Sequence, residues 1–343
     1  MKKLVVVGMM AAAGVAALAQ GSLTGSGASF PFLLYSEMFN VYKNQSGVAV
    51  NYQSIGSGGG QRAIIGRTVD FGGSDAPLTD AQLKTAPDKI VHIPMALGAV
   101  VPTYNIPGVT TNLKFTGAVL ADIYLGKIKT WNTKAIQDLN KTTKLPNLPI
   151  TVVYRSDGSG TTSIWVDYLA KVSKEWRETV SEGAVTSVKW PIGVGGPQNA
   201  GVAGLVKQTP GGIGYVELLY ATSNKLEYGF VRNGTGKFVD AGNLKELEIA
   251  SDSKVLPEDT RVSITNSDIG YPVTGFTWLL AYEDQKYGNR SKAQAQALVK
   301  MLEWALTDGQ KIHNKLGYGQ IDGSALVKAK RIVNGINYGG EKL

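Results

Sequence analysis

The stretch RSDGSGTTS, residues 155–163, gathers side chains that are suited to holding a small anion. Arg155 offers a planar pair of N–H donors that fits an oxyanion, and Asp157 is close enough in sequence to pair with it and hold it in place. The glycines let the backbone come close to a ligand, while Ser159 and Thr161 add hydroxyl donors. The apolar segment IWVDYLAKV follows and is predicted to be a helix. Because the first N–H groups of a helix are unpaired and carry partial positive charge, the stretch predicts an anion site. Under the simpler alternative, Ser159 or Thr161 only caps the helix.

The same combination of a strand, a polar turn and a helix recurs towards the N-terminus. GSGASFPFLLY places Ser29 and Phe30 before Pro31, a residue favoured at the first helical position. SIGSGGGQRAII places Ser57 in a glycine-rich turn, and VDFGGSDAPLTD places Asp75 at the end of a strand. Together these turns predict a small oxyanion that is held by several helix N-termini at once. For Asp75 the alternative is that it caps the segment APLTDAQLK.

These turns need a framework of strands and helices to bring them together. Short β-rich runs alternate with helical patterns along the chain, which is typical of a parallel-sheet α/β architecture. The strand-bearing runs are GVAVNYQSI, KIVHIPMALGAVVPTYNI, LPITVVY and GGIGYVELLYA. Helices are predicted over residues 31–43, 132–139, 163–172 and 293–306. The first of them has one apolar face with the spacing i, i+3, i+4 and i+7, formed by Tyr35, Met38, Phe39 and Tyr42.

The N-terminus and the absence of cysteine predict where the protein works. Residues 1–19 contain two lysines, an apolar run and an A-x-A ending, which indicates a signal peptide that is cleaved before Gln20. The alternative is a single membrane anchor, because the apolar run is barely shorter than a spanning helix. The sequence has no cysteine, which excludes disulfides, thiolate metal sites and a lipid-modified cysteine. We therefore expect a periplasmic protein without a lipid anchor.

Composition and charge bound the class of protein. A chain of 343 residues with 43% hydrophobic and 18% charged residues is long enough to bury at least one full core, and its length predicts two domains. The formal net charge of +8 is compatible with an anionic ligand or an acidic partner. The basic residues are scattered rather than gathered in a run, so no nucleic-acid partner is predicted.

Motifs for other chemistries are missing from the sequence. It contains no G-x-x-x-x-G-K-[ST] nucleotide loop and no G-x-S-x-G elbow, and GSGGG at residues 56–60 lacks the final glycine of a dinucleotide fingerprint. The only histidines, His92 and His313, form no H-E-x-x-H motif, and His92 falls in a predicted strand as a core or edge residue. No catalytic residue, metal or cofactor is predicted, although a hydrolase built from carboxylates alone stays open.

Taken in order, six motifs resemble those of the phosphate-binding proteins of Pst-type ABC importers. They are GSGASFPFLLY, NYQSIGSGGGQRAIIGRTVDFGGSDAPLTD, LADIYLGKIKTWN, RSDGSGTTS, VKWPIGVGG and GGIGYVE, and they extend over nearly the whole chain after the signal. The resemblance implies a two-domain α/β periplasmic binding protein of the type II-like class, with a hinge and a ligand cleft between the domains. It implies lobe I over residues 20–98 and 273–343, and lobe II over residues 99–272.

The resemblance also implies a set of binding residues for inorganic phosphate. They are Ser29, Phe30 through its backbone N–H, Ser57, Asp75, Arg155, Ser159, Gly160 and Thr161, with Asp157 orienting the arginine. Three positions depart from the family pattern. Ser29 stands where threonine is common, Gly58 where a second serine is frequent, and Tyr154 where the family carries a second basic residue. None of these differences removes a group that contacts the ligand.

The expected function is high-affinity phosphate binding and delivery to the membrane permease, as a monomer. A receptor for another oxyanion such as sulfate or molybdate, a secreted phosphatase and a structural or adhesive protein remain alternatives. Asp75 distinguishes phosphate from the other oxyanions, because an ionised buried carboxylate only accepts hydrogen bonds and so selects an anion that bears a proton.

Overall fold

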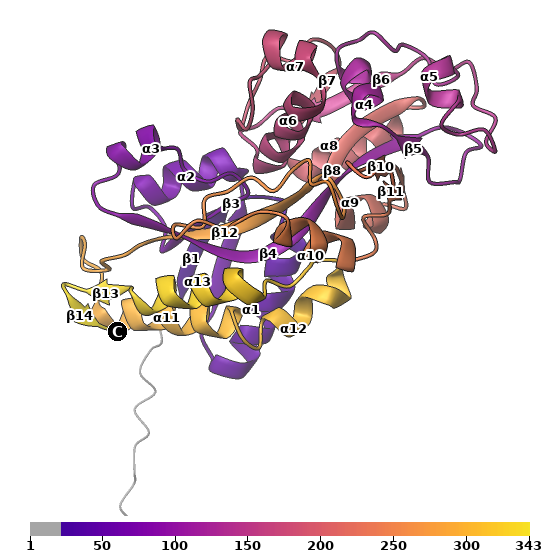
Figure 1. The fold of residues 1–343 in the computed structure, drawn as a ribbon. Coiled ribbons are helices and arrows are strands. Elements are labelled where there is room, and N and C mark those ends of the chain that lie inside the picture. Colours follow the sequence, from indigo (N-terminus) through magenta and orange to yellow (C-terminus); the bar gives the residue numbers. More distant parts are fainter. Residues whose placement is uncertain (1–21) are drawn as a thin grey trace, which may run out of the picture.

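The structure is a computed structural model that describes residues 22–343, and the predicted signal at residues 1–19 lies outside the described residues. The chain forms two α/β lobes, which Figure 1 shows at lower left and upper right. Within residues 22–343, every helix is too short or too polar to span a bilayer.

The first part of lobe I alternates strands and helices. Strand β1 pairs in parallel with both β2 and β3, so the carboxyl ends of all three strands point the same way. The predicted apolar face of the first helix is confirmed, because its four aromatic and methionine side chains are all buried. The elements are β1 (Leu23–Gly27), α1 (Phe32–Ser46), β2 (Val50–Ser54), α2 (Ser57–Ile65), β3 (Phe71–Ser74) and α3 (Asp80–Thr85).

Strand β4 (Ile90–Asn105) is 16 residues long and runs from one lobe into the other (Figure 1). Its first part, up to Ala99, pairs with β12 (Thr274–Tyr282), and its second part, from Val100, pairs with β8 (Gly212–Glu217). The Val100 N–H donates to the Val273 carbonyl at 2.9 Å, where the chain returns from lobe II. The two lobes are therefore joined by adjacent segments of extended backbone.

Lobe II holds the middle of the chain. Strand β6 pairs in parallel with β7 on one side and with β8 on the other. Its elements are β5 (Lys114–Phe115), α4 (Gly117–Tyr124), α5 (Lys134–Gln137), β6 (Thr151–Arg155), α6 (Gly160–Val172), α7 (Lys174–Thr179), β7 (Val194–Gly196), α8 (Gln198–Gln208), β8, α9 (Leu218–Ser223), β9 (Glu227–Tyr228), β10 (Phe230–Arg232), β11 (Phe238–Val239) and α10 (Lys245–Asp252).

The C-terminal part returns to lobe I. Helices α1, α11 and α13 cover one face of its sheet, and α2 covers the other (Figure 1). After β12 the elements are α11 (Lys292–Ala305), α12 (Gln310–His313), a 3-10 turn (Asn314–Leu316), α13 (Gly323–Asn334), β13 (Asn337–Tyr338) and β14 (Glu341–Lys342).

The expectation of a parallel sheet is wrong for the strands that join the lobes. Strand order is β2-β1-β3-β12-β4-β8-β6-β7, and β12 is antiparallel to both β3 and β4, as β4 is to β8. The physical reason is the route of the chain: β4 leaves lobe I and β12 comes back into it, so the two run in opposite directions side by side. The sheet is therefore mixed.

The four predicted helices exist with shifted ends. The first begins at Phe32 and the third at Gly160, while the fourth spans Lys292–Ala305. The helix predicted over 132–139 is only Lys134–Gln137. After Gln137 the backbone changes to tighter turns, in which the Leu139 N–H donates to the Ile136 carbonyl at 3.2 Å and the Asn140 N–H to the Gln137 carbonyl at 3.0 Å.

One segment inside the range predicted for lobe II lies against lobe I. The Thr260 hydroxyl donates to the His92 carbonyl at 2.8 Å, and Arg261 Nη1 donates to the Leu78 carbonyl at 2.9 Å. The indole of Trp278 donates to the Thr260 carbonyl at 3.2 Å. Residues 258–261 therefore form a strap along lobe I, whereas the Thr265 hydroxyl, a few residues further on, donates to Asp167 of α6 in lobe II.

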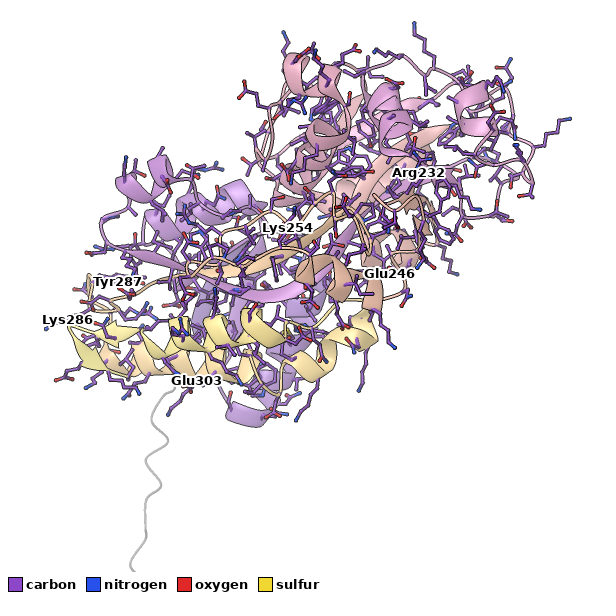
Figure 2. The ribbon with its side chains drawn as sticks, viewed as in Figure 1. Arg232, Glu246, Lys254, Lys286, Tyr287 and Glu303 are labelled. Carbon is purple, nitrogen blue, oxygen red and sulfur yellow. The ribbon has the colours of Figure 1, made fainter. Side chains whose placement is uncertain are left out.

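Each lobe has its own aromatic core. In lobe I, Phe39 packs on Phe71 with ring centroids 5.9 Å apart, and in lobe II, Trp165 stacks on Tyr215 at 5.3 Å. Burial of each such side chain contributes about 1.5–3 kcal/mol, so the two cores hold the strand ends of each lobe rigidly. Charged side chains, such as those of Arg232, Lys254 and Glu303, are spread over the surface of both lobes (Figure 2).

Candidate functional site

The predicted site residues follow the carboxyl ends of strands in both lobes. Ser29 and Phe30 lie just beyond β1, Asp75 directly follows β3, and Arg155 is the last residue of β6. Ser57 opens helix α2 after strand β2. Because the carboxyl ends of parallel strands meet at one edge of a sheet, these turns face each other where the lobes meet.

Asp75 is the acidic group of the site and is 3% exposed. Its carboxylate accepts hydrogen bonds from the Thr277 hydroxyl at 2.8 Å and from the Ser57 hydroxyl at 3.2 Å. Burial raises its pKa to about 7, although the hydroxyl of Thr277, the charge of Arg155 and the hydroxyl of Ser57 all lower it. Asp75 is thus an acid that changes its protonation state near neutral pH.

The alternative role for Asp75, as a helix cap, is wrong. Helix α3 begins at Asp80, and its N-cap is Thr79, whose hydroxyl accepts from the Gln82 N–H at 3.2 Å. Gln82 in turn accepts from the Thr79 N–H at 2.9 Å, which completes a capping box. The carboxylate of Asp75 therefore does not cap helix α3.

Arg155 is the basic group of the site, and its side chain is 1% exposed. Asp157 accepts from its Nε at 2.8 Å and from its Nη2 at 2.6 Å, so the guanidinium is held by the two-point geometry expected from the sequence. Burial opposes the ionisation of Asp157, but the hydrogen bonds and charge of Arg155 hold its pKa below the usual range. The backbone N–H of Arg155 donates to the Tyr215 hydroxyl at 3.1 Å, which ties the turn to the aromatic core of lobe II.

The start of helix α6 adds backbone donors. Ser159 is its N-cap, because the Ser159 hydroxyl accepts from the Thr162 N–H at 2.9 Å. The cap that the sequence offered as an alternative therefore exists, while Thr161 lies inside the helix. Capping uses the third N–H of the helix only, so the N–H groups of Gly160 and Thr161 remain without intrahelical partners. The Thr161 hydroxyl accepts from Arg155 Nη1 at 3.2 Å.

Ser29 and Phe30 are fixed by tyrosines from distant elements. The Tyr220 hydroxyl donates to the Ser29 carbonyl at 2.7 Å, and the Tyr318 hydroxyl donates to the Phe30 carbonyl at 2.7 Å. Both carbonyls are thereby occupied, and the Phe30 ring is completely buried against Tyr318. These two hydrogen bonds hold the backbone of the loop after β1 in place.

The two halves of the site are in direct contact. The Gly58 N–H donates to the Gly158 carbonyl across the lobes at 2.9 Å. A Cβ atom on Gly160 would lie 2.6 Å from both the Asp75 side chain and the Ser57 hydroxyl, so this approach requires glycine. Asp75 also lines a cavity of about 160 Å³ with residues of α6 and β12. The structure therefore represents a closed arrangement and brings all eight predicted residues, and Asp157, into one cluster.

Sequence reasoning missed three polar residues of this cluster. Thr277 lies in the middle of β12, and its local signal is weak, because TGFTWLLAY is largely apolar and Thr277 is not its only hydroxyl residue. Gln198 and Asn199 begin α8 directly after β7. The stretch VGGPQN repeats the pattern of strand, glycine turn and helix, and this pattern was the signal that could have found them.

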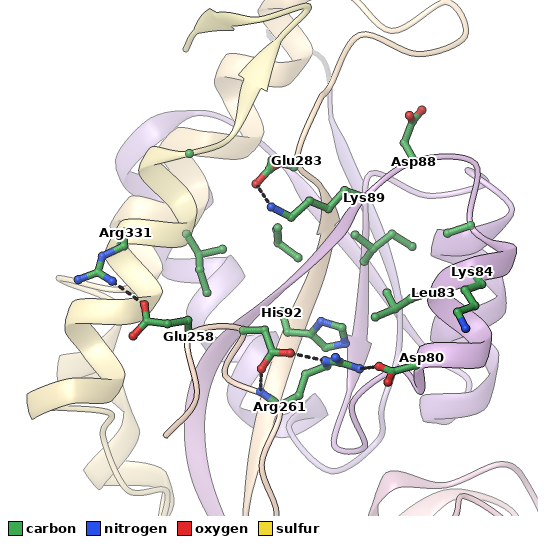
Figure 3. A pocket seen from close by; sticks show the side chains of 16 residues that line it. Asp80, Leu83, Lys84, Asp88, Lys89, His92, Glu258, Arg261, Glu283 and Arg331 are labelled. Carbon is green, nitrogen blue, oxygen red and sulfur yellow. Dashed lines mark hydrogen bonds and ion pairs between the residues drawn. The ribbon is translucent and has the colours of Figure 1, made fainter. Parts of the chain in front are cut away.

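A second hollow, of about 780 Å³, lies on lobe I and contains none of the predicted residues (Figure 3). Most of its charged groups are paired within the protein, for example Arg261 with Asp80 and Asp259 at 2.8 Å each. His92 lies at its base and accepts from the Leu78 N–H at 2.9 Å. Burial, followed by the nearby charge of Arg261, lowers the His92 pKa to about 3, and the prediction of a core histidine is confirmed.

Known proteins share both the fold and the sequence of this chain. A family model described as a PBP superfamily domain matches residues 14–308. A solved phosphate binding protein from Stenotrophomonas maltophilia superposes with a TM-score of 0.66 at 17% identity, covering 90% of this chain and 93% of that one. A solved human phosphate binding apolipoprotein superposes with a TM-score of 0.72 at 19% identity, covering 90% of this chain and 94% of that one. At such identities the likeness concerns the fold, and the two-lobed α/β architecture is that of a periplasmic binding protein.

Closer relatives narrow the class to one family. The phosphate-binding protein PstS of Pasteurella multocida is 42% identical over 87% of this chain and 85% of its own length. That of Haemophilus influenzae is 40% identical, with 87% and 88% covered, and that of Methanocaldococcus jannaschii is 38% identical, with 83% and 78% covered. The chain therefore belongs to the PstS family of phosphate-binding proteins, as its motifs indicated.

Proposed function

We propose that this protein binds inorganic phosphate between its two lobes and delivers it to the membrane permease of a Pst-type ABC importer. The observation that supports this most directly is that a buried arginine, Arg155, and a buried acid, Asp75, lie in one cluster of hydrogen-bond donors. The positive charge of Arg155 complements the negative charge of an oxyanion. Asp75 accepts a hydrogen bond from the O–H group that phosphate still carries near neutral pH. The membership of the PstS family supports the same ligand.

The proposed contacts are those predicted from the sequence. The hydroxyls of Ser29 and Thr161 and the backbone N–H groups of Phe30, Gly160 and Thr161 donate to the phosphate oxygens. The Ser57 hydroxyl, which donates to the Asp75 carboxylate in this structure, turns its hydrogen to the ligand. Arg155 supplies the cation, and Asp157 orients it. Ser159 also belongs to the proposed contacts: its hydroxyl oxygen accepts from the Thr162 N–H as the cap of α6, and its hydrogen donates to the ligand.

The remaining parts of the proposal concern the rest of the molecule. Lobe I comprises residues 20–98 and 273–343 and lobe II residues 99–272, with the strap at 258–261 resting on lobe I. The protein is an exported periplasmic monomer, its residues 1–19 are removed, and it acts as a receptor without catalysing a reaction. An N-terminus close to Gln20 in protein from the periplasmic fraction, read by mass spectrometry, supports the export step.

Isothermal titration of the purified protein with phosphate, arsenate, sulfate and molybdate tests the ligand. We expect tight binding of phosphate and arsenate, which both bear a proton near neutral pH, and much weaker binding of sulfate and molybdate. Preference for sulfate or molybdate would identify a receptor for a fully ionised oxyanion. Release of phosphate from a phosphoester would favour the phosphatase alternative.

A further inference from the structure

Asn199 connects the two lobes through a single amide group. It is completely buried at the start of α8. Its Nδ2 atom donates to the Ser29 hydroxyl oxygen at 2.9 Å and to the Thr161 hydroxyl oxygen at 3.0 Å. Ser29 belongs to the loop after β1 in lobe I, and Thr161 belongs to α6 in lobe II. One side chain therefore contacts a hydroxyl from each half of the site.

The orientation of this amide is fixed by the backbone. The Asn199 Oδ1 atom accepts a hydrogen bond from the Glu217 N–H at 2.9 Å. A backbone N–H group can only donate, so the oxygen of the amide must face Glu217. The NH₂ group must then face Ser29 and Thr161, and each of its two hydrogens has one hydroxyl oxygen as acceptor.

The two hydroxyl oxygens each accept a second hydrogen bond. Ser29 Oγ also accepts from the backbone N–H of Asn199 at 3.1 Å, and Thr161 Oγ1 also accepts from Arg155 Nη1 at 3.2 Å. A hydroxyl has two acceptor positions and one hydrogen to donate. With both acceptor positions filled, each hydrogen has to point to another partner, and within residues 22–343 neither hydroxyl donates a hydrogen bond.

Ser57 shows what a hydroxyl does in this cluster without such a neighbour. It accepts from the Asp75 N–H at 3.2 Å, and it donates to the Asp75 carboxylate, also at 3.2 Å. Its hydrogen therefore has an acceptor within the protein. The hydroxyls of Ser29 and Thr161 differ because Asn199 occupies the positions at which they could accept.

We propose that Asn199 is a positioning residue that makes the hydroxyls of Ser29 and Thr161 obligatory hydrogen-bond donors toward the bound oxyanion. The inference rests on the proposed function, since the oxyanion is the partner that receives these two hydrogens. Asn199 itself does not need to contact the ligand. Asn199 fixes the direction of the O–H bonds of Ser29 and Thr161 before the ligand arrives. Ligand binding therefore does not have to restrict the rotation of these two hydroxyls.

Titration calorimetry with phosphate on single and double variants tests this role. We expect Asn199→Ala to weaken phosphate binding by roughly tenfold, because two hydrogen bonds to the ligand lose their fixed direction. In a Ser29→Ala background the same substitution should cost only about threefold, because one of its two targets is already gone. An equal loss in both backgrounds overturns the inference, since Asn199 would then act independently of the Ser29 hydroxyl.

Asn140 provides the matched control. It is also a buried asparagine, and its side chain makes three hydrogen bonds, to the backbone of Lys114 and Ile136. Asn140→Ala should lower the melting temperature but leave phosphate affinity unchanged. A loss of affinity in this variant equal to that of Asn199→Ala would show that any buried asparagine has the same effect, and would overturn the specific role of Asn199.

Asn199→Asp keeps the inference testable if Asn199→Ala does not fold. This substitution keeps the shape of the side chain and the oxygen that accepts from Glu217, but it places a second oxygen, which accepts, where the amide donated. The hydrogens of Ser29 and Thr161 then turn towards the new carboxylate instead of the ligand, and we expect phosphate affinity to fall by more than about a hundredfold. Parental affinity in Asn199→Asp overturns the inference alone, whereas absence of phosphate binding by the parent overturns the proposed function and the inference with it.

Discussion

The two lobes bring opposite charges to the place where they meet. Lobe I contributes Asp75, whose carboxylate is held by hydroxyls of Ser57 and Thr277. Lobe II contributes Arg155, which is held by Asp157. The carboxylate can accept a hydrogen bond from a protonated ligand oxygen, and the guanidinium can bind the negative charge of the ligand. Recognition of the proton and recognition of the charge are therefore separate tasks in this molecule, and only closure of the lobes combines them.

Removing the acid of lobe I should have the strongest effect. Asp75→Asn replaces a carboxylate oxygen with an amide NH₂ group. A sulfate oxygen then faces a hydrogen-bond donor instead of another acceptor. Sites that exclude a ligand through an unpaired buried polar group discriminate by about 10⁴–10⁵, and we expect the variant to lose much of that factor in its phosphate-to-sulfate ratio. Competition titrations with both anions measure it.

Asp167→Asn is the matched control for this substitution, because Asp167 is also buried and accepts from hydroxyls, those of Ser263 and Thr265. The control should keep the parental ratio. An unaltered ratio in Asp75→Asn would refute the proton-reading role of lobe I and leave Asp75 as a structural acid.

Removing the cation of lobe II should have the next strongest effect. Arg155→Ala leaves the anion with neutral donors only, and a hydrogen bond to a charged group contributes about 1.5–3 kcal/mol. We expect phosphate and sulfate affinities to fall together by roughly tenfold to a hundredfold, because lobe II reads charge and both anions carry it. Calorimetry with each anion separates this common loss from the selective effect at Asp75.

Arg290→Ala removes another buried arginine that is paired with an aspartate, Asp70, and it changes the net charge equally. It should cost stability without changing either affinity. If Arg155→Ala altered the phosphate-to-sulfate ratio rather than both affinities, charge and proton recognition would not be divided between the lobes as we propose.

The parts of the site that could be predicted are those encoded within one turn. Arg155 and Asp157 are two residues apart, and Ser159 and Thr161 start the helix that follows, so their types and spacing carried the information. Thr277 could not be found in this way, because it lies 202 residues from Asp75 and reaches it only through the pairing of β12 with β3. The glycine turn before Asn199 could have pointed to this residue, but its contact with Ser29, 170 residues away, depends on closure of the two lobes.

The fold shows the same division between local and distant information. Alternation of strands and helices predicted the α/β class, and the spacing of Tyr35, Met38, Phe39 and Tyr42 predicted the buried face of α1. The direction of β12 was not predictable from its own apolar residues, since TGFTWLLAY fits a parallel or an antiparallel central strand equally well. Its direction follows from the return of the chain out of lobe II.

The protonation of Asp75 predicts how sulfate binding depends on pH. Burial raises the pKa of this acid to about 7, so lowering the pH protonates it and converts it into a donor that sulfate can use. Above about pH 7 the sulfate affinity of the parent should fall by about tenfold per pH unit, as the protonated fraction does, and below that pH it should level off. Calorimetry across this range should give a flat profile for Asp75→Asn. A parental profile that is equally flat would contradict a titrating Asp75.

The weakest effect should come from the contacts that hold the lobes together beside the ligand. Gln198 has a left-handed backbone, with φ of 58°, and its side chain donates to the Ser54 carbonyl at 2.7 Å and accepts from the Ser54 hydroxyl at 3.0 Å. These bonds join lobe II to lobe I, so separation of the lobes has to break them. Gln198→Ala should shift the free protein towards the open form and weaken phosphate binding by less than about tenfold, since each neutral hydrogen bond contributes only about 0.5–1.5 kcal/mol.

Small-angle scattering measures this shift directly. Phosphate should reduce the radius of gyration of the parent, and Gln198→Ala should enlarge it without ligand but reach the parental value at saturating phosphate, because the bonds to the ligand then close the lobes. Gln137→Ala is the control, since the Gln137 side chain bonds to Asn140, Thr143 and Leu145 within lobe II alone. Profiles of Gln198→Ala that match the parent under both conditions would show that the inter-lobe bonds of Gln198 add nothing to closure, and that the ligand groups of the two lobes are sufficient.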